Sequence, residues 1–222
     1  ATFTPIFGST ITDFTIAVAN SGTVAVNQTV SIIALGALSR LPKAFTDGAL
    51  ASAHDGTQIL EILTDLLLNN WSEVPPAITW ATYDPTEQWQ DAQNTGLGEI
   101  DQPGNYELAA RSSDRIDVYS LVAALASSGL GYIYEDAQGL ISYADSTHRS
   151  VYLATYGYTD VTANQALFNG LKIETRAGDV RNDITLKYKA NGSSEVSAED
   201  IGSVELYGRL AQVINTTIDK TV

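Results

Sequence analysis

Apolar and polar residues alternate along much of the first 34 residues, a pattern that is typical of β-strands. Imperfect alternation over residues 11–18 is followed by the turn-forming triplet Asn20-Ser21-Gly22 and by a second alternating run over residues 24–33. We therefore expect an antiparallel hairpin that packs one face on a hydrophobic core. A short helical turn should follow and end at Pro42, because the residue before a proline disfavours the helical conformation.

Two later segments space their apolar residues three and four positions apart, as in a helix that buries one face. One covers residues 59–67, where Asp55 or Thr57 is a candidate for capping the first turn. The other runs from Asp117 to Gly129, and this glycine stands where a residue of left-handed conformation commonly ends a helix. The leucine-rich face of the first helix is expected to lie in the core.

The second helix is followed by the pattern of a hairpin. Tyr132-Ile133-Tyr134 and residues 140–143 flank a turn at residues 136–139. A helix that leads into a hairpin forms a compact α+β unit.

Strand-like alternation returns in the last quarter of the chain. It occurs at residues 171–175 and 184–188, and a final strand is expected around residues 211–218. Between these strands, Ser197 is a candidate cap for a short helix that reaches Gly208. The expected fold class is therefore α+β and rich in β-strands.

Residues 70–110 interrupt this order with an insertion rich in proline and tryptophan. Periodicity is lost from residue 71 to residue 105, and the segment holds all three tryptophans, Trp71, Trp80 and Trp89. Rings of this size are rarely left free in solution, so local core packing is the favoured interpretation of the tryptophans. Stacking against sugar rings is the alternative, which makes the same residues candidate glycan contacts.

The composition indicates a folded chain and disfavours several classes of partner. Hydrophobic residues make up 44% of the 222 residues and charged residues only 17%, which argues against intrinsic disorder. With 26 acidic against 12 basic side chains, the net charge of −14 disfavours binding to nucleic acid or to an anionic membrane surface. No apolar run approaches the roughly 20 residues of a membrane helix, so we expect a soluble chain without membrane insertion.

The strand-like start at Ala1, without a charged and then apolar leader, suggests a fragment or a processed product.

Few residues have the spacing of a catalytic or metal site. The chain has no cysteine, and His54 and His148 are each isolated in a polar segment, so we interpret both as exposed loop histidines. There is no G-x-S-x-G motif and no complete phosphate-binding loop. We therefore expect no metal, no cofactor and no enzyme activity.

Glycoside hydrolysis is the enzyme class that stands as an alternative, because it needs only two acids at the right separation beside an aromatic groove. The candidate acids are Asp84, Glu87 and Asp91 among the tryptophans, and Glu135 and Asp136 beside Tyr132 and Tyr134. With 26 acidic residues in the chain, some stand near aromatic residues by chance. Carbohydrate binding without cleavage is a further alternative, because the stacking of a sugar on an aromatic ring needs no catalytic acid with a shifted pKa.

Three motifs stand in one order along the chain. Near the N-terminus, Pro5-Ile6-Phe7-Gly8 is followed by Ile11-Thr12-Asp13-Phe14. Residues 130–149 contain Asp136-x-x-Gly139-x-Ile141 after a helix, and the C-terminal block runs from Asn182-Asp183-Ile184 to Tyr207-Gly208-Arg209. In these motifs and their order the chain resembles the minor tail proteins, the tail-tip or baseplate hub proteins, of long-tailed bacteriophages.

This resemblance implies a structural protein of the virion, located in the phage tail, that forms a ring at the end of the tail tube. It implies β-barrel-like hub domains that flank an α+β domain. Residues 1–45 would be the end of a first barrel, residues 46–164 the α+β domain with its insertion, and residues 165–222 a second β-rich hub domain.

The resemblance also implies the partners. Further copies of the chain, usually as a homotrimer, and neighbouring tail proteins would contact it, with Asp13, Phe14, Tyr207 and Arg209 as candidate interface residues. For the Tyr207-Gly208-Arg209 turn, a helix end followed by a solvated arginine is an equally favoured interpretation. A ring would cover the strand edges that the two β-rich ends expose. Genomic DNA would pass through without specific binding, because acidic side chains repel it within a Debye length of about 8 Å.

Overall fold

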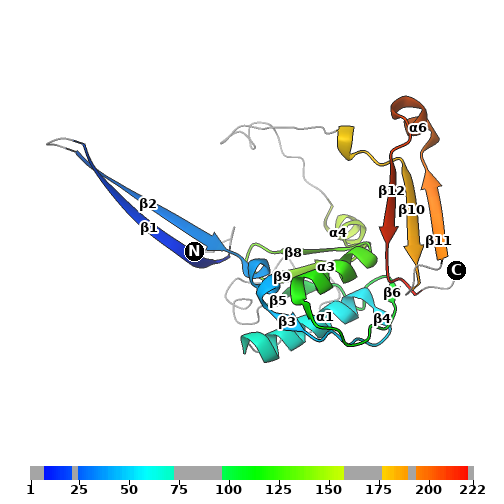
Figure 1. Cartoon of the computed structure of the whole chain (residues 1–222), viewed down its shortest axis with the longest axis horizontal. Helices are drawn as coiled ribbons and strands as arrows, with labels where there is room; N and C mark the ends of the chain where they lie inside the picture. Colours follow the sequence, from blue (N-terminus) through cyan, green and yellow to red (C-terminus); the bar gives the residue numbers. More distant parts are fainter. Residues whose placement is uncertain (1–7, 22–24, 73–96, 158–176, 190–193, 220–222) are drawn as a thin grey trace.

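The computed structural model describes residues 8–21, 25–72, 97–157, 177–189 and 194–219. Figure 1 shows three parts along the chain: an N-terminal hairpin, a central body of helices and small sheets, and a C-terminal three-stranded sheet. The fold is therefore α+β, as the sequence pattern predicts.

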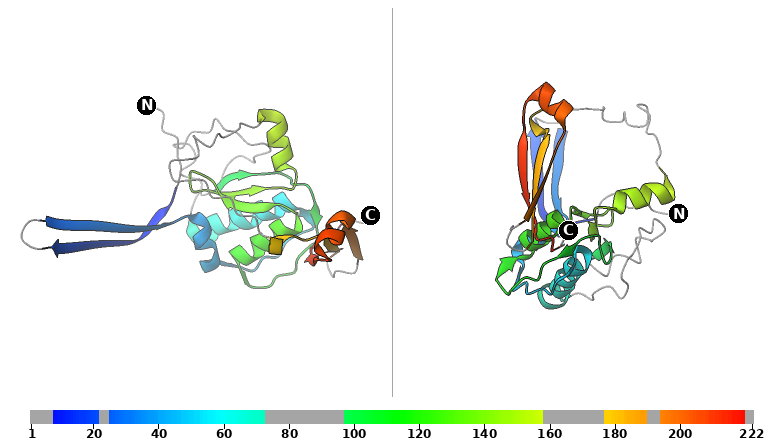
Figure 2. Two further views of the ribbon diagram at one scale, coloured as in Figure 1. Left: turned by 90° about the horizontal axis from the view of Figure 1, so that it is seen from above. Right: turned by 90° about the vertical axis from the view of Figure 1, so that its right-hand side faces the viewer.

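The N-terminal hairpin forms as the alternation predicts, but its surroundings differ from the expectation. Strands β1 (Thr10–Ser21) and β2 (Ala25–Leu35) pair antiparallel, with Phe14 opposite Ile32 and Ile16 opposite Val30. Figures 1 and 2 show the hairpin reaching away from the body. The expectation that one face packs on a core is wrong for a single chain, because the large apolar side chains of the hairpin are exposed.

The hydrophobic core of the body lies between two helices and a three-stranded sheet. Helix α1 (Asp55–Asp65) continues into a π-helical segment, η2 (Leu66–Trp71), and packs against helix α3 (Val118–Ser128). In the sheet, β9 (Ile141–Ala144) lies between β5 (Leu97–Ile100) and β8 (Tyr132–Glu135). The predicted helix faces supply much of this core, including Ile59, Leu63, Leu66, Leu67, Val118 and Val122.

Short elements complete the body around this core. The 3-10 helix η1 (Ala37–Lys43) ends one residue after Pro42 and buries Leu41. Two antiparallel pairs, β3 (Phe45–Thr46) with β7 (Ile116–Asp117) and β4 (Ala53–His54) with β6 (Glu107–Leu108), tie together segments far apart in the sequence. Helix α4 (His148–Tyr156) follows β9 and lies on the edge of the body.

The start of α1 differs from the expected cap. His54 occupies the N-cap position and makes no capping hydrogen bond with its side chain. Asp55 instead bonds to Tyr143 in the interior, and the Thr57 hydroxyl bonds to the carbonyl of Pro103. Neither of the two candidate residues therefore caps this helix.

Both ends of α3 lie where the sequence predicts, although the left-handed residue is displaced. Asp117 is the N-cap, and its carboxylate accepts a hydrogen bond from the Ser120 N–H at 2.8 Å. Gly129 ends the helix with a φ of −74°, whereas Leu130 adopts a φ of 55°. The left-handed conformation therefore falls one residue after the glycine.

Replacing Asp117 with alanine should lower the melting temperature by about 2–4 °C, because the first turn of α3 loses its cap. The Ser120 N–H also holds the pKa of Asp117 below its usual value, so the carboxylate stabilises the folded chain above the ordinary aspartate pKa. This contribution is lost as the pH falls through the lowered pKa, and the difference from wild type, measured by thermal unfolding, should shrink in acid. Asp117→Asn keeps an acceptor oxygen and should lose less; an equal loss in both variants would argue against the cap.

The C-terminal sheet has β10 (Asp183–Tyr188) at its centre. β11 (Ser194–Glu199) pairs with it antiparallel, β12 (Ala211–Asn215) pairs with it parallel, and helix α6 (Ile201–Tyr207) connects the outer strands. Ser197 lies within β11 and does not cap α6. The cap is Asp200, whose carboxylate accepts a hydrogen bond from the Ser203 N–H at 3.1 Å.

The segment that follows β12 attaches this sheet to the body. Ile218 is buried in the core, the Ala109 N–H donates to the Thr217 carbonyl, and the Lys189 N–H donates to the Ile218 carbonyl. Within the described residues, the sheet is therefore joined to the body at its foot, and its far end carries α6 (Figure 1).

None of the described sheets closes into a barrel. The hairpin has two strands and the C-terminal sheet has three, and so few strands cannot close on themselves. The barrel-like domains expected at the two ends are therefore not completed by the described part of one chain. The strand expected at residues 171–175 lies outside the described residues.

Candidate functional site

The hairpin, residues 8–35 and called the arm below, has an apolar and a polar face. Cross-strand pairing places five large side chains, each 54–60% exposed, on the apolar face: Ile11, Phe14, Ile16, Val30 and Ile32. The opposite face carries Asp13, Thr15 and Ser31, with Ile33 and, at the base of the arm, Leu35 as the large apolar residues among its described side chains. Exposed apolar patches of this kind mark contact surfaces, and a lone two-stranded hairpin is marginally stable in water.

The arm is almost free of charge. Asp13 is the only ionisable residue between Gly8 and Gly36, in a chain whose net charge is −14. Because like charges repel, a second acidic chain is repelled less by the arm than by a surface that carries the acidic side chains. Of the two interface candidates in the arm, Phe14 lies on the apolar face and Asp13 on the polar face.

Asn182 holds the turn that contains the other two interface candidates. Its side chain, which is buried, donates a hydrogen bond to the Gly208 carbonyl at 2.8 Å and accepts one from the Leu210 N–H at 2.7 Å. The two halves of the C-terminal motif, around Asn182 and Gly208, are thus one structural unit.

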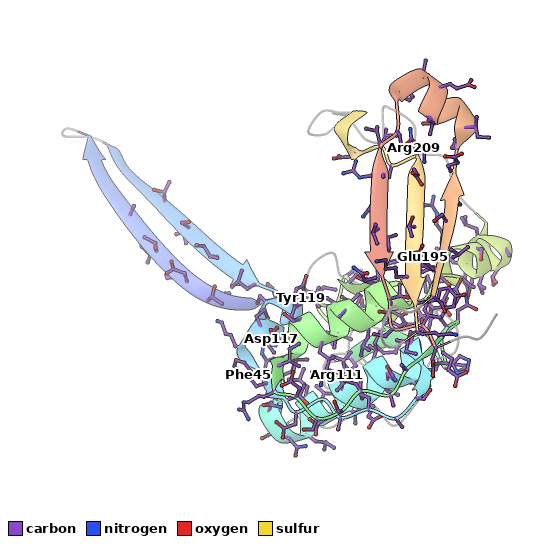
Figure 3. All side chains as sticks on the ribbon, turned by 45° about the vertical axis from the view of Figure 1, so that its right-hand side comes forward. Phe45, Arg111, Asp117, Tyr119, Glu195 and Arg209 are labelled. Carbon is purple, nitrogen blue, oxygen red and sulfur yellow. The ribbon has the colours of Figure 1, made fainter. Side chains whose placement is uncertain are left out.

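Arg209 and Tyr207 differ in their contacts within this unit. Arg209 forms ion pairs with Asp183 and Glu199 at the end of the sheet that lies away from the body (Figure 3). Tyr207 is 58% exposed at the end of α6. Arg209 is therefore engaged within its own chain, while the tyrosine ring is accessible to a partner.

Trp71 packs against the core at the end of η2. The guanidinium of Arg40 lies 3.7 Å from the centre of the indole ring, which is within the range of a cation–π contact. This ring is thus in contact with other parts of its own chain. The other tryptophans, Trp80 and Trp89, lie outside the described residues, as do the acids Asp84, Glu87 and Asp91.

The second acid pair of the glycosidase alternative makes local contacts with the backbone. Glu135 accepts a hydrogen bond from the Leu38 N–H at 3.2 Å. Asp136 accepts hydrogen bonds from the N–H groups of Gln138 and Leu140, at 2.9 and 2.8 Å, within the turn between β8 and β9. Burial raises the pKa of Asp136. In these positions both carboxylates hold the hairpin and its neighbouring helix η1.

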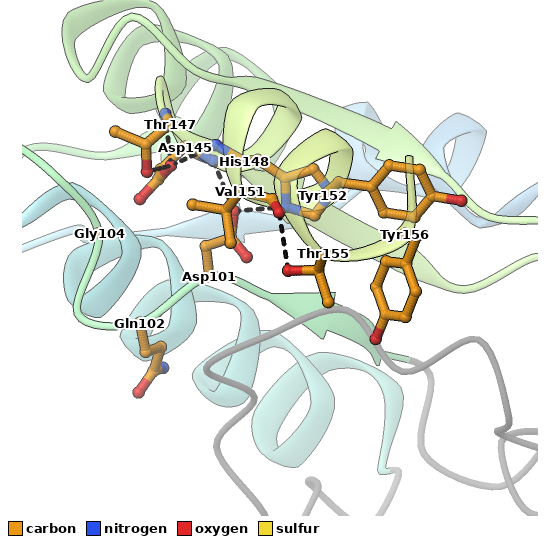
Figure 4. A pocket seen from close by; sticks show the side chains of 10 residues that line it. All are labelled: Asp101, Gln102, Gly104, Asp145, Thr147, His148, Val151, Tyr152, Thr155 and Tyr156. Carbon is orange, nitrogen blue, oxygen red and sulfur yellow. Dashed lines mark hydrogen bonds and ion pairs between the residues drawn. The ribbon is translucent and has the colours of Figure 1, made fainter. Parts of the chain in front are cut away.

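His148 is not an exposed loop histidine, which corrects the interpretation made from the sequence. It is the first residue of α4, its side chain is only 12% exposed, and its Nδ1 lies 2.7 Å from Asp101 Oδ2 (Figure 4). The hydrogen bond to this carboxylate raises the pKa of His148. His54, in contrast, is exposed on β4 as expected.

Local hydrogen bonds hold both members of this pair in place. The Asp145 carboxylate accepts hydrogen bonds from the N–H groups of Thr147 and His148, at 2.7 and 2.9 Å, where α4 begins. The Asp145 N–H donates to Asp101 Oδ2 at 3.0 Å. Asp101 directly follows β5, and its N–H donates to the carbonyl of Tyr143 on β9 at 3.1 Å. The pair therefore lies where a strand ends and a helix starts.

Glu99 lies beside this pair. One ligand atom from each of Glu99, Asp101 and His148 lies within 4.8 Å of the others, and both carboxylate residues are 7% exposed. Asp101 and His148 line a cavity of about 180 Å³ beneath α4, together with Gln102, Tyr152 and Tyr156 (Figure 4). Because 47 positions separate Asp101 from His148, no local spacing in the sequence signals this cluster.

A second buried titratable residue, Asp55, lies between α1, β9 and the end of α3. It is 0% exposed, its Oδ2 accepts a hydrogen bond from the Tyr143 hydroxyl at 2.6 Å, and its Oδ1 accepts one from the Tyr106 N–H at 3.2 Å. Burial raises the pKa of Asp55. Gly129 approaches it so closely that a Cβ there would lie 2.3 Å from Oδ2. The sequence offers Asp55 only as a helix cap, so this contact emerges from the tertiary structure alone.

Comparison with known proteins adds no relative. No protein-family model matches the chain, and no curated protein matches it significantly. Among the described helices, none has the length and apolar composition needed to span a membrane.

Proposed function

We propose that the chain is a structural subunit of a bacteriophage tail tip or baseplate hub, which forms a ring that closes or extends the tail tube and anchors distal tail components. The observation that carries this proposal is the arm, a hairpin with a single charged residue, Asp13, and with five exposed apolar side chains on one face. Such a hairpin becomes stable when another surface covers it. The three ordered motifs supply the class of assembly, the phage tail.

The partner that fits the arm is a second copy of the same chain. Among the described strands, none pairs with the outer edge of β11 or of β12 in the C-terminal sheet, and the exposed Val196 and Val213 lie on these two strands. Open strand edges accept further strands or partner surfaces. If the arm of one copy covers the sheet of the next, both β-rich ends are completed by one contact that repeats around a closed ring. Barrel-like hub domains would then be built from the strands of neighbouring copies, with three copies as the expected number.

The acidic composition suits the same assembly. A ring of chains that each carry a net charge of −14 repels DNA wherever acidic side chains face the bore, so the genome passes without adhering. The neighbouring tail proteins would contact the outer faces of the ring. A neutral or basic bore in the assembled particle would argue against this role of the charge.

Native mass spectrometry of the purified chain tests the assembly. The expected mass is three times the 23.7 kDa of one chain. The double variant Phe14→Thr with Ile32→Thr should give the mass of a single chain, because it removes an apolar cross-strand pair from the exposed face. Threonine retains a high β-propensity, so the hairpin itself should persist.

Ile33→Thr is the matched control, since Ile33 lies in the same strand on the opposite face of the arm. It should leave the oligomer intact. A single-chain mass for the wild type, or an oligomer that survives the double substitution, would overturn assembly through the arm. Labelling of intact virions with an antibody against the chain should mark the distal end of the tail, and labelling of any other part of the particle would overturn the phage tail assignment.

A further inference from the structure

We propose that Glu99, Asp101 and His148 together bind one divalent transition-metal ion of the Zn²⁺ or Mn²⁺ class at the cavity beneath α4. The proposal is independent of the ring assembly, because all three residues belong to the body of one chain. It also differs from the expectation drawn from the sequence, which gave the chain no metal.

The donor set suits this class of ion. An imidazole nitrogen with two carboxylate oxygens is a common combination for Zn²⁺ and is also accepted by Mn²⁺, whereas Mg²⁺ and Ca²⁺ favour sites made of oxygen alone. Three protein ligands leave a coordination position for water, as in metal sites that are open to solvent. The adjoining cavity, which Tyr152 and Gln102 help to line, provides room for that water.

The distances suit a shared ion. Zinc–ligand distances of about 2.0–2.2 Å in a tetrahedral site place two ligand atoms about 3.3 Å apart. His148 Nδ1 and Asp101 Oδ2 are 2.7 Å apart, and the ligand atoms of all three residues lie within 4.8 Å of one another. Side-chain rotations that change these separations by about 0.6 Å for the closest pair, and by at most about 1.5 Å for the others, therefore suffice to bring the three donors around one ion.

The ligands are supported by rigid neighbours, as in metal sites that are preorganised. Asp101 accepts the Asp145 N–H at 3.0 Å, and its own backbone is bonded to β9. His148 is held at the first turn of α4 by the Asp145 carboxylate. Glu99 belongs to β5 itself. An ion at this position would link β5 to α4 and so hold the helix against the edge of the body.

The first experiment is isothermal titration of the untagged chain with ZnCl₂ and, separately, with MnCl₂ and MgCl₂, after removal of metal with EDTA. One Zn²⁺ or Mn²⁺ per chain should bind, with Mg²⁺ at least about tenfold weaker. Loss of an outer contact of a metal site typically costs about 10- to 100-fold in affinity, so removal of a ligand in His148→Gln or Asp101→Asn should cost at least about 100-fold. His54→Gln is the matched control, because it removes the other, exposed histidine and should leave the affinity unchanged.

The second experiment needs no variant and so holds even if His148→Gln fails to fold. The chain has two histidines, which give two sets of imidazole signals in an NMR spectrum of the wild type. Zn²⁺ at one equivalent should shift the ring signals of one histidine, the less exposed His148, and leave those of His54 in place. No binding at one equivalent, a shift of both histidines alike, or an unchanged affinity in His148→Gln would each overturn the site and leave the His148–Asp101 contact as a structural ion pair.

Discussion

The Tyr143→Phe variant is expected to lose about 2–3 kcal/mol of unfolding free energy at neutral pH, because Asp55 then keeps a buried carboxylate with one donor fewer. The Tyr143 hydroxyl donates to Asp55 Oδ2 at 2.6 Å, and both residues are 0% exposed, so no solvent replaces the lost bond. The remaining donors to the carboxylate are the backbone N–H groups of Tyr106 and Gly56. Denaturant unfolding of the two proteins measures the difference.

The unfolding free energy lost in Tyr143→Phe should depend on pH, and the pKa of Asp55 determines the direction of this dependence. Burial raises this pKa above the ordinary value of 3.8, so the folded chain binds the proton more tightly than the unfolded chain and stability falls as the pH rises through this range. Removal of the Tyr143 hydroxyl raises the pKa of Asp55 further and makes the fall steeper. The difference between wild type and Tyr143→Phe should therefore be small in acid, where Asp55 is neutral, and should grow toward neutral pH.

Two further variants separate this mechanism from a loss of packing. Tyr119→Phe removes a hydroxyl from an exposed tyrosine of α3 and should change stability by less than about 0.5 kcal/mol. In an Asp55→Asn background, which lacks the ionisable group, Tyr143→Phe should cost less and its cost should not change with pH. A cost that is the same at every pH in the wild-type background would contradict the account given for Asp55.

Gly56→Ala is expected to destabilise the chain by about 3 kcal/mol, at the upper end of the usual range for overpacking. A Cβ at this position would lie 1.9 Å from the Asp101 carbonyl oxygen and 3.0 Å from the Pro103 carbonyl oxygen. Both atoms belong to backbone, so no side-chain rotation relieves the clash, and α1 must move away from the segment that follows β5. The hydrogen bond from the Thr57 N–H to Pro103, at 3.1 Å, should weaken in the same movement.

Gly202→Ala is the matched control for this substitution. Gly202 also lies in the first turn of a helix, α6, but the nearest atom to a Cβ there is Asp200 Oδ1 at 3.6 Å, which is an ordinary contact. Alanine should be neutral or stabilising by up to about 1 kcal/mol, because it has the higher helix propensity. Equal destabilisation by the two substitutions in thermal or denaturant unfolding would show that the close approach at Gly56 is not the cause.

Local pattern was sufficient to predict most elements of this fold. The alternation around Phe14 and Ile32 predicted the hairpin, and the spacing of Ile59, Leu63 and Val122 predicted two helices and their buried faces. The spacing also predicted that the second helix begins at Asp117, whereas the capping bond from the Ser120 N–H to this residue was found only in the structure. One detail was wrong: Leu130 rather than Gly129 takes the left-handed conformation, and the glycine instead allows the close approach of Asp55.

The candidate sites were much less accessible to prediction. His148 was interpreted as exposed because its sequence neighbours are polar, yet its decisive neighbour, Asp101, is 47 positions away. Asp55 was offered as a cap because it precedes a helix, while its main donor, Tyr143, is 88 positions away. Neither contact can be seen in the spacing of apolar residues, because a single side chain from another helix or strand does not change the sequence pattern of the element that it contacts.

The amino-acid sequence by itself determined the class of the fold, the places of the N-terminal hairpin, of α1 and α3 and of the β8–β9 hairpin, the apolar faces of the first hairpin and of the two helices, and the acidic character of the chain, but not β5, α4 or β11. These properties follow from the period of apolar residues and from composition, which act locally or as sums over the chain. Only the tertiary structure decided which apolar faces find cover within one chain, leaving the arm exposed while α1 and α3 are buried, and which buried polar groups meet, as His148 meets Asp101. The alternation of apolar and polar residues shows that one face of a strand is apolar, but it does not show which part of the protein covers that face. Contacts between residues far apart in the sequence form only when the strands and helices pack together.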